Sequence, residues 1–92
     1  MLIIGKKVDE YLQFLAQKGF QLGEDAIGFI AFGQSYTDSS EDLVIVAIEL
    51  TLKAQKEFDG SFFISLLEML KENNILTRTE ALQFTKMKKI IQ

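Results

Sequence analysis

The chain lacks histidine, cysteine, tryptophan and proline altogether. Histidine is the commonest general base near neutral pH, and cysteine is a strong nucleophile and a soft metal ligand. Their absence excludes disulfides, zinc fingers and iron–sulfur clusters. Any reaction would depend on carboxylates, Lys, Arg, Tyr, Ser or Thr. We therefore expect a protein that is not an enzyme and holds no cofactor.

Length and composition limit the architecture to one small domain. The chain has 92 residues, of which 48% are hydrophobic and 25% charged, which is typical of a folded protein. A compact chain of this length has a radius of gyration of about 12 Å, enough for one core. We expect residues 1–92 to form a single domain. In length and composition the sequence resembles many small bacterial or phage proteins.

The charge is uneven along the chain. The net charge is −3, and residues 19–52 contain no base but carry six acids, namely Glu24, Asp25, Asp38, Glu41, Asp42 and Glu49. A dedicated nucleic-acid binder usually presents a strongly basic face, so nucleic acid is an unlikely partner. No apolar run approaches the ~20 residues that span a bilayer. At the start, apolar residues precede Lys6 and Lys7, the reverse of the order in a signal peptide. We expect a cytoplasmic protein without membrane contact.

Hydrophobic spacing predicts three helices clearly. Val8, Tyr11, Leu12 and Leu15 follow a 3.6-residue period, and Gly19 fits the left-handed position after a helix. Residues 61–73 carry the stripe Phe63, Leu66, Leu67 and Leu70. The Asn73–Asn74 pair suits the end of that helix. Thr77 and Glu80 form a capping box for a last helix, with an apolar edge of Ala81, Phe84, Met87 and Ile91.

The middle of the chain is ambiguous. A helix over 24–36 would be buried on most sides, with Phe29, Phe32 and Tyr36 along one ridge, and Gly28 and Gly33 would let neighbouring elements approach. Residues 43–52 are rich in β-branched side chains, but Glu49, Lys53 and Glu57 have the spacing of a helical charge ladder. We favour a mainly α fold, a compact bundle of four to five short helices. The alternative is an α+β fold with a small sheet from residues 26–33 and 43–52.

The acidic pairs suit helix starts better than chemistry. Asp38 with Glu41, or Ser39 with Asp42, matches the capping pattern at the start of a helix. The same segment lacks the spacing and the glycine of a calcium loop, so we expect no metal. The Glu24–Asp25 pair also fits a solvated helix start, and we name no catalytic residue.

Two binding functions are open. Surplus apolar side chains favour contact with another protein, or with a second copy in a twofold homodimer, through Ile45, Phe62, Ile64 and Met69. The apolar segments 2–4 and 90–91 would contribute to this surplus. The alternative is a small DNA-binding regulator in which residues 61–89 form a helical hairpin. The contacts would then come from Arg78, Gln83, Lys86 and Lys89, with Thr79 and Lys88 beside them.

Overall fold

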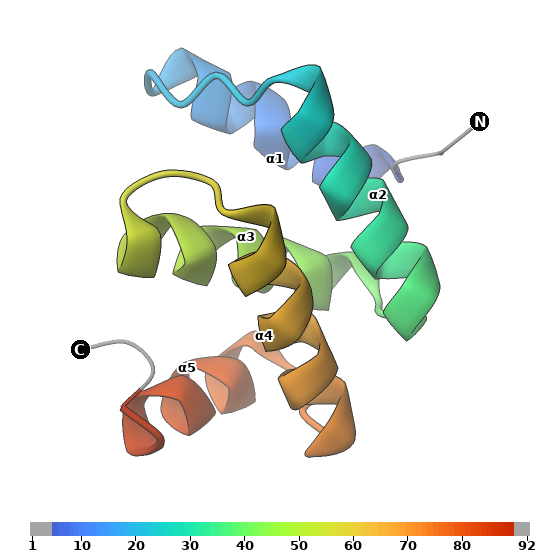
Figure 1. The fold of residues 1–92 in the computed structure, drawn as a ribbon, viewed down its shortest axis with the longest axis vertical. Coiled ribbons are helices and arrows are strands. Elements are labelled where there is room, and N and C mark those ends of the chain that lie inside the picture. Colours follow the sequence, from blue (N-terminus) through green and yellow to red (C-terminus); the bar gives the residue numbers. More distant parts are fainter. Residues whose placement is uncertain (1–4, 90–92) are drawn as a thin grey trace.

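The computed structural model describes residues 5–89, and this part of the chain folds into five helices without a strand. The helices are α1 (Lys6–Gln17), α2 (Glu24–Thr37), α3 (Glu41–Gln55), α4 (Gly60–Glu72) and α5 (Arg78–Met87). Short connections join them into a compact bundle (Figure 1). The radius of gyration of 12.1 Å agrees with the value expected for the length. The prediction of a mainly α fold is confirmed.

Helix α3 lies at the centre of the bundle and packs against each of the other four helices (Figure 1). Seven of its residues are buried, in a run from Leu43 to Thr51. A helix buried on almost every side needs few polar residues, which explains why its sequence resembled a buried strand. The alternative sheet from residues 26–33 and 43–52 is wrong, because both segments are helical.

The first and fourth helices bury the stripes that the sequence predicts. Val8 and Leu15 of α1 are buried, and Tyr11 and Leu12 pack partly against the core. Gly19 has a φ of +96° after α1, and the N–H of Phe20 donates to the carbonyl of Leu15 at 2.8 Å. In α4 the core residues are Phe63, Leu66, Leu67 and Leu70.

The predicted cap of α3 is wrong by one or two residues. Ser40, rather than Asp38 or Ser39, is the N-cap, and its side chain accepts a hydrogen bond from the N–H of Leu43 at 3.2 Å. Asp38 has a φ of +53° and ends α2 in the left-handed conformation instead. The turn between the two helices therefore consists of Asp38, Ser39 and Ser40.

Helix α5 begins as predicted but buries a different face near its end. Thr77 and Glu80 form the capping box, and Asn74 before it has a φ of +56°. Ala81 and Thr85 are buried and Phe84 is half-buried. Met87 is 79% exposed, so its predicted place on an apolar edge is wrong. Ile91 and the apolar segments 2–4 and 90–91 lie outside the described residues.

The glycines of α2 differ in their role. A Cβ built on Gly33 would lie 2.9 Å from Cε2 of Phe63, so the absence of a side chain lets α2 and α4 approach. Nothing lies within 4 Å of a Cβ built on Gly28. The predicted close packing is therefore confirmed for Gly33 and wrong for Gly28.

Candidate interaction surface

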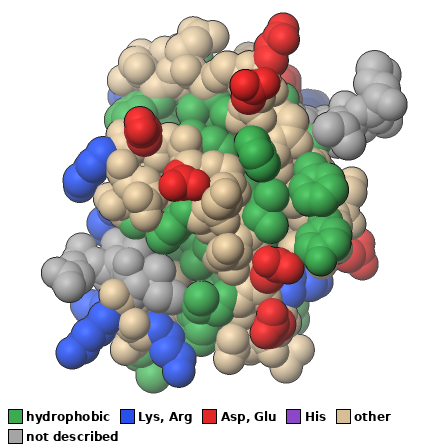
Figure 2. Space-filling view, viewed as in Figure 1, with side chains coloured by type: hydrophobic (Ala, Val, Ile, Leu, Met, Phe, Trp, Pro, Cys, Tyr) green, Lys and Arg blue, Asp and Glu red, His purple; other side chains and the backbone are tan. Residues whose placement is uncertain are grey.

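Helix α2 carries three exposed aromatic side chains. Phe29, Phe32 and Tyr36 are 45%, 49% and 63% exposed. We call these three residues the aromatic face. The expectation that this ridge is buried is wrong, because the buried residues of α2 are Ile30, Ala31 and Gly33 instead. Figure 2 shows hydrophobic side chains gathered over α2, on the right of the view.

The members of the aromatic face form one continuous surface. The rings of Phe32 and Tyr36 stack with centroids 5.5 Å apart and planes inclined by 10°. Phe29 and Phe32 line one open hollow of about 350 Å³ with Gly28. The Phe29 ring also lies against Gly60 at the start of α4, where a Cβ would meet it at 2.6 Å. Phe29 is therefore held by the fold, whereas Phe32 and Tyr36 extend further into solvent.

Acidic side chains border the aromatic face at both ends. Glu24 and Asp25, in the first turn of α2, line the hollow beside Phe29 and Phe32. Glu68 and Glu72 of α4 line another open hollow beside Tyr36. Acidic side chains lie above and below the hydrophobic cluster in Figure 2. Lys71 lines the same hollow as Tyr36, and its Nζ donates to the carbonyl of Asp38 at 3.0 Å.

The four apolar residues predicted from sequence as a contact surface lie elsewhere. Ile45, Phe62 and Ile64 are half-buried and pack against the core. Ile64 faces α2, since its Cγ1 would lie 3.4 Å from a Cβ on Gly33. Met69 is 36% exposed. A contact between these residues and a partner stays a prediction, with less accessible surface than the aromatic face offers.

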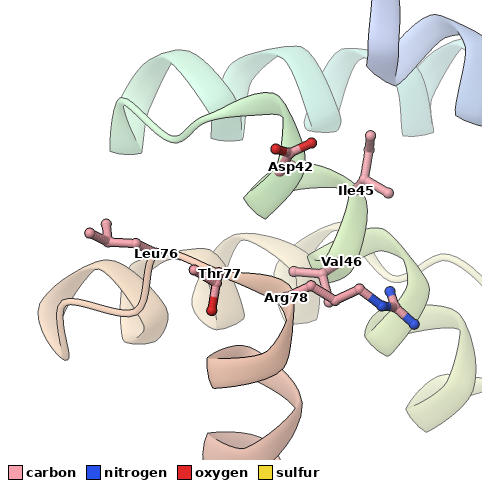
Figure 3. A pocket seen from close by; sticks show the side chains of 6 residues that line it. All are labelled: Asp42, Ile45, Val46, Leu76, Thr77 and Arg78. Carbon is pink, nitrogen blue, oxygen red and sulfur yellow. The ribbon is translucent and has the colours of Figure 1, made fainter.

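A third hollow, of about 350 Å³, lies between the start of α3 and the segment that leads into α5 (Figure 3). From α3 come Asp42, Ile45 and Val46. The other side is formed by Leu76, Thr77 and Arg78. The structure thus brings together one residue predicted for protein contact, Ile45, and one predicted for nucleic acid, Arg78.

Arg78 already has a carboxylate partner inside the molecule. Its guanidinium forms a bidentate ion pair with Glu49 of α3, in which Nη2 lies 2.9 Å from Oε2. The hydrogen bond to Glu49 raises the pKa of Arg78 further above its ordinary value. Nearby, burial raises the pKa of the Tyr11 hydroxyl, the negative charge of Glu49 adds to that rise, and Arg78 opposes it. Glu49 therefore pairs with α5 rather than with the predicted ladder partner Lys53.

The other residues predicted to contact nucleic acid are exposed on or after α5. Gln83 and Lys86 lie on the helix, and Lys89 follows it with a φ of +57°. With Arg78 neutralised by Glu49, the free positive charge lies near the end of α5. Recognition helices usually contact bases with residues near their beginning.

Two features are absent from residues 5–89, a cluster of metal ligands and a membrane-spanning helix. No group of three or more Asp or Glu side chains in this range is placed to hold a metal ion. None of the five helices combines the length and apolarity needed to cross a bilayer. Glu41, one of the acids near the start of α3, has a structural role. It accepts a hydrogen bond from the N–H of Val8 at 2.9 Å and so caps α1.

The sequence contained part of the signal for the aromatic face. Phe29, Phe32 and Tyr36 share one side of a helix by spacing alone. Their exposure could not be inferred, because α2 is apolar around most of its circumference and has no polar side to identify the solvent-facing surface.

Comparison with known proteins gives a family but no relative of known role. No curated protein matched the chain, and no solved structure matched it. Residues 3–91, nearly the whole sequence, match the family DUF6123, which is described as a family of unknown function. The chain belongs to this family.

Proposed function

We propose that this protein acts by binding another protein through the aromatic face of α2. The observation that carries the proposal is the exposure of three neighbouring aromatic side chains, each at least 45% accessible. Soluble monomers rarely expose contiguous apolar patches of this kind unless the patch is used, and aromatic residues are enriched in the centre of protein interfaces. The non-enzymatic character and the cytoplasmic location stay predictions from the sequence.

The aromatic face is not needed to complete the core. Phe63, Ile30, Ile48 and Leu67 fill the interior of the bundle and are fully buried. Phe32 and Tyr36 stack on each other rather than on the core. Fully burying a Phe side chain stabilises a protein by about 1.5–3 kcal/mol. About half of that free energy is unused at Phe32, and somewhat more at Tyr36, and is available to a complex.

Another exposed aromatic residue, Phe14, already has neighbours of its own. Phe14 is 50% exposed but has Tyr11 stacked at 6.2 Å and the Lys18 ammonium 5.6 Å from its ring centre. Single exposed hydrophobic residues are normal on protein surfaces. The alternative proposal, DNA binding through α5, has less support because Arg78 is paired with Glu49.

The proposal is tested by exchanging the two most exposed members of the aromatic face for a small polar residue. We expect the Phe32→Ser/Tyr36→Ser variant to keep the helical circular dichroism spectrum and to lose the protein that co-purifies with the tagged wild type from its native host. Phe14→Ser is the matched control, because it removes an aromatic ring of similar exposure from α1.

Comparison of Phe14→Ser with Phe32→Ser/Tyr36→Ser shows whether the loss of the partner is specific to the aromatic face. Retention of the partner by Phe14→Ser and its loss from the α2 variant would support the proposal. If both variants kept the partner, or if the wild type recovered none, the proposed function would be contradicted. Binding of labelled genomic DNA at low salt, weakened steeply by added salt, would favour the nucleic-acid alternative instead.

A further inference from the structure

We infer that the segment docking on the aromatic face is a short amphipathic helix of another protein, with Lys or Arg at both ends of its apolar stripe. This inference rests on the proposed function and adds the chemical class of the partner. It follows from the shape of the surface and from the charges at its two ends.

The aromatic face has the dimensions of a single helix. From Phe29 to Tyr36 it covers about two turns of α2, a length of ~10 Å. Standard interfaces between folded domains bury about 800 Å² on each side, which needs many more residues than three. An amphipathic helix that places apolar side chains at every third or fourth position matches this length and the open hollow beside Phe29 and Phe32.

The border of the aromatic face selects for positive charge. Glu24 and Asp25 lie at one end, and Glu68 and Glu72 at the other. Lys71 offsets one of the two negative charges at the second end, where its ammonium contacts the carbonyl of Asp38. Both ends are therefore net acidic. Complementary charges steer association and fix the register of a bound segment, whereas like charges oppose it.

The same charges disfavour a second copy docked through this face. In a twofold dimer the ends of one aromatic face would lie opposite the ends of the other. Because both ends are acidic, acids would face acids in either relative orientation of the two faces. Nucleic acid is disfavoured for the same reason, since its phosphates are negative. A basic apolar segment is the occupant that both observations favour.

A display library of random peptides, each about 14 residues or four turns long, tests this inference directly. Selection is made on wild-type protein, with counter-selection on Phe32→Ser/Tyr36→Ser. We expect the enriched peptides to be helical and net positive, with apolar residues at helical spacing. Enriched peptides that depend on the aromatic face but are neutral or acidic would overturn the inference and leave the proposed function standing. If no peptide depended on the face, both would be overturned.

The contribution of the acidic border is then measured on the best peptide by fluorescence anisotropy. We expect Glu24→Gln/Asp25→Asn/Glu68→Gln/Glu72→Gln to weaken binding about tenfold, because several surface ion pairs, each worth up to about fivefold, are lost. Glu10→Gln on α1 is the control and should leave the affinity unchanged. Equal affinity for the wild type and the neutralised variant would overturn the inference. Self-association would overturn the inference too. It would appear as a molecular mass that rises with protein concentration and falls when the peptide is added.

Discussion

At the scale of single residues, Gly28 and Gly33 show how one helix can need a glycine at one position and tolerate it at another. A Cβ at Gly33 would meet Phe63 at 2.9 Å and Leu67 at 3.3 Å, and both neighbours are fully buried. A Cβ at Gly28 would meet nothing within 4 Å. The two positions therefore predict alanine substitutions of opposite sign.

We expect Gly33→Ala to lower the free energy of unfolding by about 1–2 kcal/mol, because overpacking in a closed core outweighs the better helix propensity of alanine. Gly28→Ala should raise it by about 0.5–1 kcal/mol through propensity alone. Urea denaturation of both variants measures the difference. A stabilised Gly33→Ala variant would show that α2 and α4 are not in close contact there.

The carboxylate of Glu80 gives a pH-dependent prediction. Its pKa is lowered chiefly because it accepts hydrogen bonds from the backbone N–H groups of Leu76 and Thr77, both at 3.1 Å. A lowered folded-state pKa means that this group contributes stability above its unfolded pKa of about 4.3, and that the contribution is lost as the pH falls through the folded value. A carboxyl NMR titration should give Glu80 a midpoint below about 4.3. A midpoint at or above that value would contradict the capping box.

At the scale of helices, α1 depends on α3 for its N-terminal cap. The residue before α1 is Gly5, which has no side chain to cap it. Glu41 supplies the missing acceptor from the start of α3 by receiving the N–H of Val8. Lys7 and Asp42 add an exposed ion pair at 3.6 Å. The first turns of these two helices are therefore joined.

We expect Glu41→Ala to destabilise the protein by about 1–2 kcal/mol, because the N–H of Val8 would lose its acceptor. Glu41→Gln should lose less, since its amide oxygen can still accept. Denaturation gives the free energies, and amide hydrogen exchange at Val8 reports the cap itself. Equal losses in the two variants would indicate that the charge matters rather than the hydrogen bond.

The helices differ in how far their sequences predict them. α1, α4 and α5 have one apolar and one polar side or a recognisable cap, so periodicity and capping rules located them. The helical character of α2 and α3 was harder to predict because both are apolar around most of their circumference. For the same reason the exposed side of α2 could not be identified, since which side of an apolar helix meets solvent is decided by its neighbours. The contact of Glu41 with α1 likewise depends on a residue 33 positions away.

At the scale of the whole molecule, the bundle is organised around α3 and leaves one side of α2 without a neighbour. α2 packs against α4 and α3, while Phe32 and Tyr36 remain 49% and 63% exposed and hydrophobic side chains gather over α2 in Figure 2. The ion pair between Glu49 and Arg78 fixes α5 to the other side of α3. The molecule thus separates a closed core from an exposed aromatic surface with acidic ends.

Site-specific photo-crosslinking in the native host tests the binding function of that surface most directly. A photoreactive phenylalanine analogue replaces Phe32 in one strain and Phe14 in another, so that both probes occupy exposed aromatic positions. We predict that the probe at position 32 forms a covalent adduct with a different protein, whereas the probe at position 14 does not. An unreacted chain at position 32, or an adduct between two copies of this chain, would contradict it.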